Sequence, residues 1–204
     1  MVVVVRVLLI GHSYVRRARK YRFTQRMNAF RMWVGNVRLE FAYIYKGGTN
    51  YKFFNESMEY RNQILEHNPD VIFTILGGNA VASRGEPQSK IEDATREMRV
   101  FHAWLRSRFP QALLVPGEVE ARYNWHRGLP EGHVGESYKQ RRRAFNKAIV
   151  RMKDKDYTLR LGEALHDKER YYEADGIHFK EEGNRRFWEF IVDTLRFIIA
   201  DQQW

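Results

Sequence analysis

A serine near the start of this chain and an aspartate and a histidine near its end have the residue types of a nucleophilic triad. Ser13 directly follows an apolar run, and Asp175 and His178 lie three residues apart just before an amphipathic segment. A serine hydroxyl becomes a good nucleophile only when a base takes its proton, and that base needs a third group to hold its tautomer. We therefore interpret Ser13 as a nucleophile, His178 as its general base and Asp175 as the group that orients the imidazole.

Groups that can stabilise an oxyanion follow three predicted strands. Ser13 lies where the first strand meets a helix, so its backbone N–H belongs to a helix N-terminus. Gly47 and Gly48 follow the second strand and offer unhindered N–H groups, and Asn79 follows the third strand with a side-chain amide. Because ligands bind at the carboxyl ends of strands in open α/β sheets, we expect these donors to lie close together.

The elements that must position these residues alternate along the chain. Apolar runs predict strands at 2–10, 37–45, 71–76, 112–115 and 157–161, and helical spacing predicts helices at 13–32, 50–67, 91–105, 136–153 and 187–198. The segment 118–135 has no clear periodicity and is predicted to be a long loop over the site. Right-handed crossovers place the helices on both faces of the sheet. We therefore predict a single-domain, doubly wound α/β/α sandwich over residues 1–204, with a five-stranded parallel sheet.

Four short blocks, in this order on these strand ends, resemble the SGNH hydrolases, the GDSL-type esterase and lipase family. The blocks are Gly11-His12-Ser13, Gly47-Gly48-Thr49, Gly77-Gly78-Asn79 and Asp175-Gly176-Ile177-His178. The resemblance covers roughly residues 5–200 and implies a flavodoxin-like sandwich that hydrolyses esters through an acyl-serine, without a cofactor. It implies a triad of Ser13, His178 and Asp175, and an oxyanion hole of Ser13, Gly47 or Gly48, and Asn79. It also implies short acyl substrates, such as acetyl esters of sugars or small alcohols.

The sequence departs from the family pattern in two places. The family's Gly-Asp-Ser is Gly11-His12-Ser13 here, and its Gly-x-Asn-Asp is Gly77-Gly78-Asn79-Ala80. In the family both acids usually support the site and neither belongs to the triad. One interpretation is a compensated exchange, with His12 bonding where the first acid did; the other is a relaxed or inactive site. More loosely, the run Gly11-His12-Ser13-Tyr14-Val15-Arg16-Arg17 and the basic charge resemble SGNH modules of animal mobile-element proteins.

Each predicted site residue also has a purely structural interpretation. Ser13 could be the N-cap of the first helix, and Asp175 could form a turn or begin a helix. Asn79 could be a turn residue, the glycines plain turn glycines, and His12 a structural histidine. The presence of all four blocks favours the catalytic interpretation for Ser13, Asp175, His178 and Asn79.

The charge balance suggests a second function class. The chain has 35 lysine and arginine residues against 25 acidic ones, a net charge of +10. Its densest basic run contains Arg141, Arg142, Arg143 and Lys147, and continues to Arg151, Lys153 and Lys155; a second basic segment spans Arg16 to Arg26. These could form a solvated face or an anion-binding surface. The alternative function is thus a catalytically weak or inactive module that binds nucleic acid or anionic lipid.

Several other classes are disfavoured. The chain has no cysteine, which excludes disulfides and thiol catalysis. No apolar run approaches the roughly 20 residues that span a bilayer. Because no signal-peptide pattern precedes the first strand, we expect an intracellular, cytoplasmic or nuclear, location; the abrupt start fits either an excised domain or a complete small enzyme. His126 and His133 lack metal-ligand spacing and no phosphate-loop lysine follows Gly77-Gly78-Asn79, so we expect no metal and no nucleotide cofactor.

Overall fold

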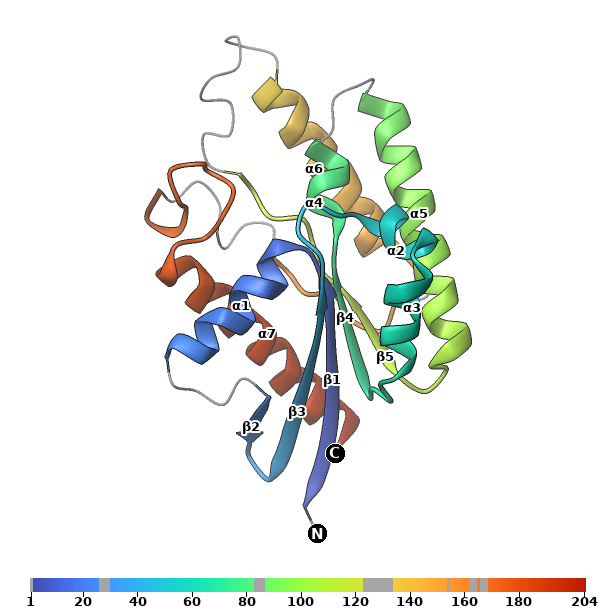
Figure 1. Cartoon of the computed structure of the whole chain (residues 1–204), viewed down its shortest axis with the longest axis vertical. Helices are drawn as coiled ribbons and strands as arrows, with labels where there is room; N and C mark the ends of the chain where they lie inside the picture. Colours follow the sequence, from blue (N-terminus) through green and yellow to red (C-terminus); the bar gives the residue numbers. More distant parts are fainter. Residues whose placement is uncertain are drawn as a thin grey trace.

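A five-stranded, mostly parallel sheet forms the centre of the computed structural model (Figure 1), which describes residues 2–25, 30–82, 87–122, 134–153, 155–161, 165 and 169–204. The strand order is β2-β3-β1-β4-β5. The strands are β1 (Val3–Gly11), β2 (Arg31–Val34), β3 (Val37–Tyr45), β4 (Val71–Ile75) and β5 (Leu113–Pro116). All neighbouring pairs are parallel except β2 with β3.

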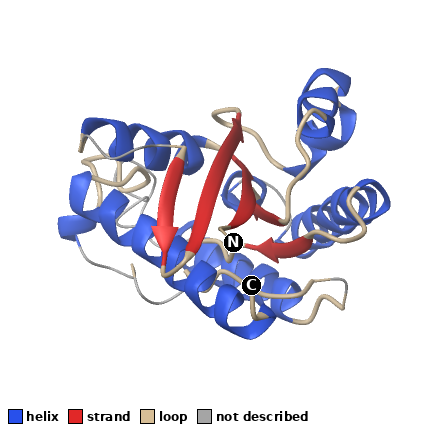
Figure 2. Cartoon of the chain, turned by 90° about the horizontal axis from the view of Figure 1, so that it is seen from below, coloured by secondary structure: helices blue, strands red, loops and turns tan. Residues whose placement is uncertain are grey.

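Helices cover both faces of this sheet, as Figure 2 shows from below. On one face, α1 (Ser13–Thr24) and α7 (Glu181–Gln202) pack against alternate residues of β1, such as Val7 and Leu9. The other face, with Leu8 and Ile10, packs against the remaining helices. These are α2 (Tyr51–Glu56), α3 (Met58–Leu65), α4 (Gly77–Ala82), α5 (Pro87–Arg108) and α6 (Val134–Val150). The predicted doubly wound α/β/α class is therefore confirmed.

The fifth strand of the sheet is not the one that the sequence pattern predicted. Residues 157–161 make only an isolated parallel bridge, between Leu159 and Gly117. Leu159 N–H donates to the Pro116 carbonyl (3.0 Å), and Glu118 N–H donates to the Leu159 carbonyl (3.0 Å). Pro116 has no N–H with which to continue the ladder toward residue 157. The Tyr157 N–H still donates to the Leu114 carbonyl (3.4 Å), so the segment runs beside β5 but forms a bridge only at Leu159.

The fifth strand is instead β2, at the opposite edge, where the sequence pattern had predicted helix up to residue 32. Helix α1 ends at Thr24, and β2 pairs antiparallel with β3 from Val34 opposite Val37 to Arg31 opposite Glu40. Gly35, with a φ of 60°, and Asn36 close a two-residue hairpin between them. A two-residue hairpin turn with positive φ at its first position favours glycine there, as at Gly35.

Three further boundaries differ from the predicted ones. The helix predicted over 50–67 is divided at Ser57, whose hydroxyl accepts the Tyr60 N–H (3.5 Å) and so begins α3. Gly77-Gly78-Asn79 forms the first turn of α4 rather than a loop. Of the predicted long loop, 118–122 has neither helix nor strand, and α6 begins at Val134; Tyr123, Trp125, His126 and His133 lie outside the described residues.

A short 3-10 helix, η1 (Glu169–Tyr171), precedes the segment that contains Asp175 and His178. None of the helices that the structure describes is both long enough and apolar enough to cross a membrane.

Candidate active site

Three of the four sequence blocks follow strands that end side by side at one edge of the sheet. Gly11, the last residue of β1, pairs with Tyr45 of β3 on one side and with Ile75 of β4 on the other. The His12 N–H donates to the Ile75 carbonyl (3.3 Å), and the Lys46 N–H donates to the Gly11 carbonyl (3.2 Å). The serine, glycine and asparagine blocks therefore begin from neighbouring backbone positions (Figure 1).

Ser13 is the first residue of α1, and His12 is the N-cap residue, without a side-chain capping bond. The interpretation of Ser13 as an N-cap is therefore wrong. Ser13 is 9% exposed, so its position is buried but reaches solvent. Gly11 permits the sharp passage from strand to helix, because a Cβ there would lie 2.3 Å from Val15 Cγ2 and 2.8 Å from the Ile75 carbonyl oxygen.

Asp175 and His178 form a hydrogen-bonded pair. The Asp175 Oδ2 lies 2.6 Å from His178 Nδ1, and the Oδ1 accepts the backbone N–H groups of Ile177 (2.8 Å) and His178 (2.9 Å). Partial burial raises the pKa of Asp175, but the hydrogen bonds from His178 and Ile177 outweigh it and leave this pKa below its usual value. The aspartate thus forms the turn and also orients the imidazole, which leaves His178 Nε2 for another proton partner.

Two residues near the start of α1 hold the histidine segment against that helix. The Tyr14 hydroxyl donates to the Ile177 carbonyl, and Arg17 Nη1 donates to the Phe179 carbonyl (3.3 Å). The rings of Tyr14 and Phe179 pack with centroids 4.6 Å apart. Within the described part of the chain, no hydrogen bond joins the Ser13 hydroxyl to His178. In enzymes without bound substrate, the distance between the nucleophile and its base is often long, and the hydrogen bond forms when substrate binds.

The glycine and asparagine blocks contact each other directly. Asn79 Nδ2 donates to the Thr49 carbonyl (2.9 Å), and the Thr49 hydroxyl donates to the Lys46 carbonyl (2.7 Å), which closes the turn that contains both glycines. Gly48 has a φ of 74°, a conformation that favours glycine, whereas Gly47 has an ordinary φ. Asn79 is helical, so the interpretation of it as a positive-φ turn residue is wrong.

Two charged residues that were not predicted to belong to the site lie next to the asparagine block. Arg122 Nη2 donates to Asn79 Oδ1 and to the Gly78 carbonyl, both at 3.2 Å. Glu120 is 1% exposed, and burial raises its pKa. The alternation Glu118-Val119-Glu120-Ala121-Arg122, directly after a buried strand, was the available signal for charges at this edge of the sheet.

His12 is buried in the same place. Its ring lies 4.8 Å from the ring of Tyr14, and neither ring nitrogen has a hydrogen-bond partner among the described residues. Burial lowers its pKa to about 3, with smaller contributions from the charges of Arg122 and His178. His12 is therefore a neutral imidazole at physiological pH, which cannot replace the charge of an aspartate.

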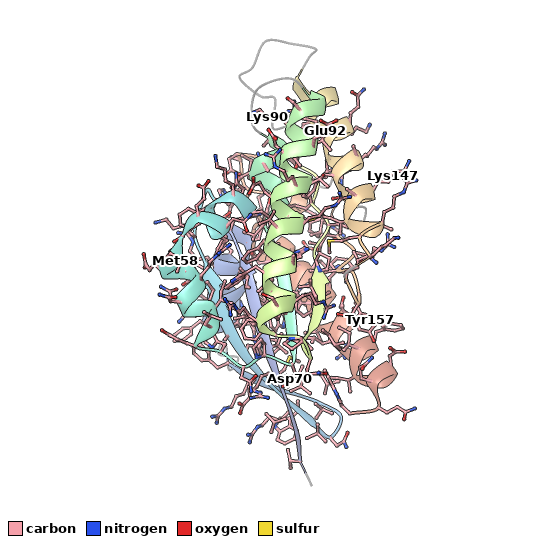
Figure 3. The ribbon with its side chains drawn as sticks, turned by 90° about the vertical axis from the view of Figure 1, so that its right-hand side faces the viewer. Met58, Asp70, Lys90, Glu92, Lys147 and Tyr157 are labelled. Carbon is pink, nitrogen blue, oxygen red and sulfur yellow. The ribbon has the colours of Figure 1, made fainter. Side chains whose placement is uncertain are left out.

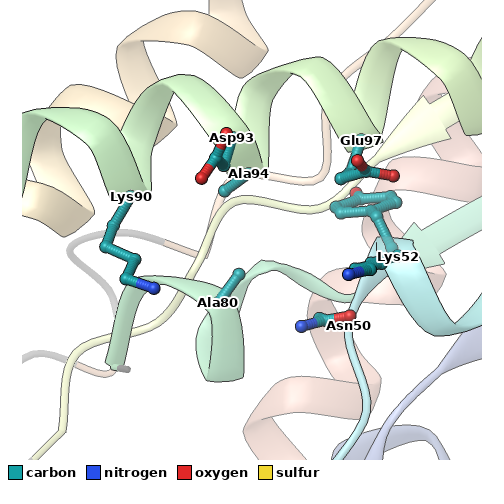
Figure 4. A pocket seen from close by; sticks show the side chains of 8 residues that line it. Asn50, Lys52, Ala80, Lys90, Asp93, Ala94 and Glu97 are labelled. Carbon is teal, nitrogen blue, oxygen red and sulfur yellow. The ribbon is translucent and has the colours of Figure 1, made fainter. Parts of the chain in front are cut away.

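A cavity of about 200 Å³ lies beside the oxyanion candidates (Figure 4). It is bounded by Asn50 and Ala80, which directly follow Thr49 and Asn79 in the chain, and by Lys90, Asp93 and Glu97, which extend from α5 (Figure 4). Most of its side chains are polar or charged, so it suits a small hydrophilic group.

The predicted anion-binding residues divide into two groups. Arg141 and Arg142 are each only 5% exposed, and Arg141 Nε donates to the Val81 carbonyl (2.9 Å). Their predicted place on a solvent-facing surface is therefore wrong, because α6 turns them inward together with Phe145. Arg143 and Lys147 are exposed, as the helical stripe predicted.

The basic residues of the N-terminal helix also divide. Arg22 is buried, with its guanidinium 4.5 Å from the centre of the Trp188 ring, whereas Arg16 and Lys20 are exposed. Arg26 lies outside the described residues. In the part of the chain that the structure describes, no group of three or more metal-binding side chains is present.

Comparison with known proteins identifies the fold. No family profile and no curated protein matches the sequence. Among solved structures, this chain resembles a carbohydrate esterase family 3 protein from Talaromyces cellulolyticus. The match covers 97% of this chain and 99% of that one, with a TM-score of 0.65 and 12% sequence identity. The chain has the SGNH-hydrolase fold. The chain also resembles an acetyl esterase mutant with an acetate ion: the match covers 97% of this chain and 99% of that one, with a TM-score of 0.66 and 12% identity. A GDSL-like lipase from Bacteroides thetaiotaomicron matches over 94% of this chain and 87% of its own length, with a TM-score of 0.61 and 14% identity.

Proposed function

We propose that this SGNH-fold protein is a serine esterase with a Ser13–His178–Asp175 triad. Ser13 Oγ attacks the acyl carbonyl while His178 Nε2 takes its proton, and the same proton passes to the leaving alcohol. The Ser13 N–H, the Gly47 or Gly48 N–H and the Asn79 amide stabilise the oxyanion. Water then attacks the acyl-serine, with His178 again as the base, and releases the acid.

The observation that carries this proposal is the 2.6 Å contact between Asp175 and His178 Nδ1, on a segment that is hydrogen-bonded to Tyr14, the residue after Ser13. A carboxylate that fixes one nitrogen of a half-buried imidazole leaves the other nitrogen as a base, which is the arrangement that activates a hydroxyl. The buried His12 is neutral and packs against the ring of Tyr14, so it is suited to packing rather than to proton transfer.

The proposed substrates are short acyl esters, such as acetyl esters of sugars or small alcohols. The small cavity beside Asn50 and Ala80, to which five polar or charged side chains contribute, supports a small hydrophilic alcohol part. The names of the structural neighbours, a carbohydrate esterase and an acetyl esterase, agree with this choice.

Covalent labelling with a fluorophosphonate probe tests the proposal. We expect an adduct of one probe on the peptide that contains Ser13, and we expect Ser13→Ala and His178→Ala to abolish both labelling and hydrolysis of p-nitrophenyl acetate. Ser107→Ala, which removes an exposed hydroxyl on α5, is the matched control and should change neither. Ester turnover at the wild-type level in a folded Ser13→Ala variant would disprove the mechanism.

A second function is favoured by one further observation, a set of exposed cations without acidic partners. We define the α6 ridge as Arg143, Lys147, Arg151 and Lys153, all of them exposed. Within the described ranges none of the four makes a salt bridge, whereas Arg185 and Arg186 of α7 both pair with Glu189 at 2.6 Å. Figure 3 shows Lys147 extending from α6 away from the body of the protein.

We infer that the α6 ridge binds the phosphate backbone of nucleic acid. Residues four apart on a helix advance by about 6 Å along its axis, so Arg143, Lys147 and Arg151 form a linear row of charge. A helix that lies on a membrane also presents exposed apolar side chains. The exposed large hydrophobic residues in the described part of the chain lie on elements other than α6, which favours nucleic acid over lipid.

Binding of a labelled oligonucleotide between 50 and 200 mM salt tests this inference. Replacing Arg143, Lys147 and Arg151 with glutamine should weaken binding and reduce the slope of log K against log salt by roughly 2 to 3. The matched control replaces three arginines that have acidic partners, Arg96, Arg185 and Arg196, which removes the same charge. Absence of binding at low salt, or an equal effect of both triple variants, would refute a site on the ridge.

A further inference from the structure

Arg122 contacts both the side chain and the backbone of the asparagine block. Its Nη2 donates to Asn79 Oδ1 and to the Gly78 carbonyl, each at 3.2 Å. A guanidinium can only donate, and the two ends of a primary amide have nearly the same shape but opposite hydrogen-bonding character. A donor placed on Oδ1 therefore decides which end is which. The Nδ2 end is turned toward the Thr49 carbonyl, 2.9 Å away, on the side of the glycine turn.

Arg122 is one of three polar groups that lie around Gly78. A Cβ on Gly78 would lie 3.3 Å from Glu120 Oε1, 3.4 Å from His12 Nε2 and 3.7 Å from Arg122 Nη2. A carboxylate, an imidazole and a guanidinium thus surround one backbone position. Glu120 is 1% exposed, and the charge of Arg122 favours its ionised form, although burial has the larger effect on its pKa.

The ring of Tyr138 completes this support. The Arg122 guanidinium carbon lies 5.4 Å from the centre of that ring, and the Tyr138 hydroxyl donates to the Glu120 carbonyl (3.0 Å). Burial raises the pKa of Glu120, and the charge of Arg122 opposes that rise. Tyr138 of α6 therefore fixes the segment 120–122, and from this segment the Arg122 side chain reaches Asn79.

We propose that Arg122 is a positioning residue of the esterase: it fixes the Asn79 amide so that Nδ2 gives one N–H to the Thr49 carbonyl and the other to the oxyanion, and Glu120 helps to hold Arg122 in place. This inference rests on the function proposed above. It also explains how the site accommodates Ala80, which offers no polar side chain beside Asn79. The support for the amide comes instead from a segment about 40 residues further along the chain.

A double-mutant cycle between Arg122→Met and Asn79→Ala tests the proposal. Methionine keeps much of the length of arginine but removes its charge and its donors. Loss of one oxyanion donor typically lowers kcat by about 10²-fold or more. We expect each single variant to lower kcat for p-nitrophenyl acetate by about 10²-fold with little change in KM. If Arg122 acts through Asn79, the double variant should be no slower than Asn79→Ala alone.

The controls separate positioning from folding. Arg106→Met removes another partly buried arginine, one that donates to the Ala112 carbonyl (2.7 Å) at the opposite end of β5, and should leave kcat unchanged. Arg122→Lys retains the charge and one donor and should recover part of the lost kcat. Should Arg122→Met fail to fold, as judged by its thermal melt, the cycle is run with Arg122→Lys, which must show the same non-additivity.

The outcomes distinguish this inference from the proposed function. Multiplicative losses in the cycle, or a wild-type kcat in folded Arg122→Met, would overturn the role of Arg122 while Ser13 labelling by the fluorophosphonate remained. A wild-type protein that is neither labelled at Ser13 nor dependent on Ser13 for turnover would overturn the esterase itself.

Discussion

The two carboxylate oxygens of Asp175 make different hydrogen bonds, so one substitution can remove one set of bonds and keep the other. Oδ1 accepts two backbone N–H groups and forms the turn, and Oδ2 contacts His178 Nδ1. In Asp175→Asn the amide oxygen can still form the turn, but the amide nitrogen cannot accept a proton from the ring. We predict that kcat falls by about 10³- to 10⁴-fold, as the wrong imidazole tautomer becomes favoured, with little loss of stability.

Steady-state kinetics and a thermal melt of Asp175→Asn check this prediction. Asp193→Asn is the matched control, because Asp193 is an exposed acid on α7 that pairs with Arg196 (2.9 Å). A kcat within a few-fold of wild type for Asp175→Asn would mean that this aspartate is only a turn residue.

Local spacing made the Asp175–His178 pair predictable, since residues three apart in a turn can contact one another. Arg122 was not predictable in this way, because its contact with Asn79 joins residues 43 positions apart and depends on the path of segment 118–122. The burial of Arg141 was predictable but missed. It lies four residues before the inward-facing Phe145, and so on the same face of α6.

At the scale of elements, burial decided which strands could be predicted. The strands β1 and β4 are buried on both faces and read as continuous apolar runs, as does most of β5. The strand β2 has only four residues and exposes Arg31 and Trp33 at the edge of the sheet, so it lacks a continuous apolar run. The clearest sequence signal for this strand was the Gly35-Asn36 turn that follows it. The segment 157–161 has the right composition for a strand but finds only one bridging partner.

The start of α7 gives a prediction at this scale. A Cβ on Gly183 would lie 2.3 Å from the Tyr171 carbonyl oxygen and 2.9 Å from Phe179 Cβ. Alanine is normally favoured over glycine inside a helix by about 1 kcal/mol. Here the clash involves backbone that cannot move without shifting the turn between η1 and His178. We therefore predict that Gly183→Ala destabilises the fold by about 1–3 kcal/mol and lowers kcat as well.

Chemical denaturation and kinetics of Gly183→Ala measure the two effects together. Gly35→Ala is the control: it strains a residue whose φ is 60°, but a Cβ there meets nothing within 4 Å. It should lower stability by about 1–2 kcal/mol and leave kcat unchanged, because the β2–β3 hairpin is remote from the site. A stabilised Gly183→Ala with wild-type kcat would show that η1 and α7 can separate freely.

At the scale of the whole molecule, the predicted order of elements proved sufficient to bring the two chain ends together. Helices α1 and α7 pack side by side on one face of the sheet, and Tyr14 contacts the segment just before α7. This agrees with the alternation of strands and helices along the chain and with the family resemblance. The order of elements did not predict which lysines and arginines are exposed. That depends on the face of the helix on which each residue lies and on its ion pairs.

Two fully buried histidines make the stability of the whole fold depend on pH. Burial lowers the pKa of both His12 and His102 to about 3, with smaller contributions from nearby arginines, Arg122 and Arg106 respectively. In the unfolded chain each titrates near 6.5. Between these values the unfolded state binds more protons than the native state, so the free energy of unfolding falls as the pH is lowered from about 6.5.

The expected loss is about 2 kcal/mol for each histidine between pH 7 and pH 5. Asp175 does not contribute in this window, because its pKa lies below the usual value near 3.9. Urea unfolding at several pH values measures the total, and His102→Gln isolates one part. His102 Nε2 contacts the Thr74 hydroxyl (2.8 Å), so the variant loses some stability at every pH, but the loss between pH 7 and pH 5 should be smaller than in wild type by about 2 kcal/mol. Glu120, whose pKa burial raises, contributes with the opposite sign and equally in both proteins. An equal slope in both proteins would mean that His102 is already protonated, or solvated, in the native state.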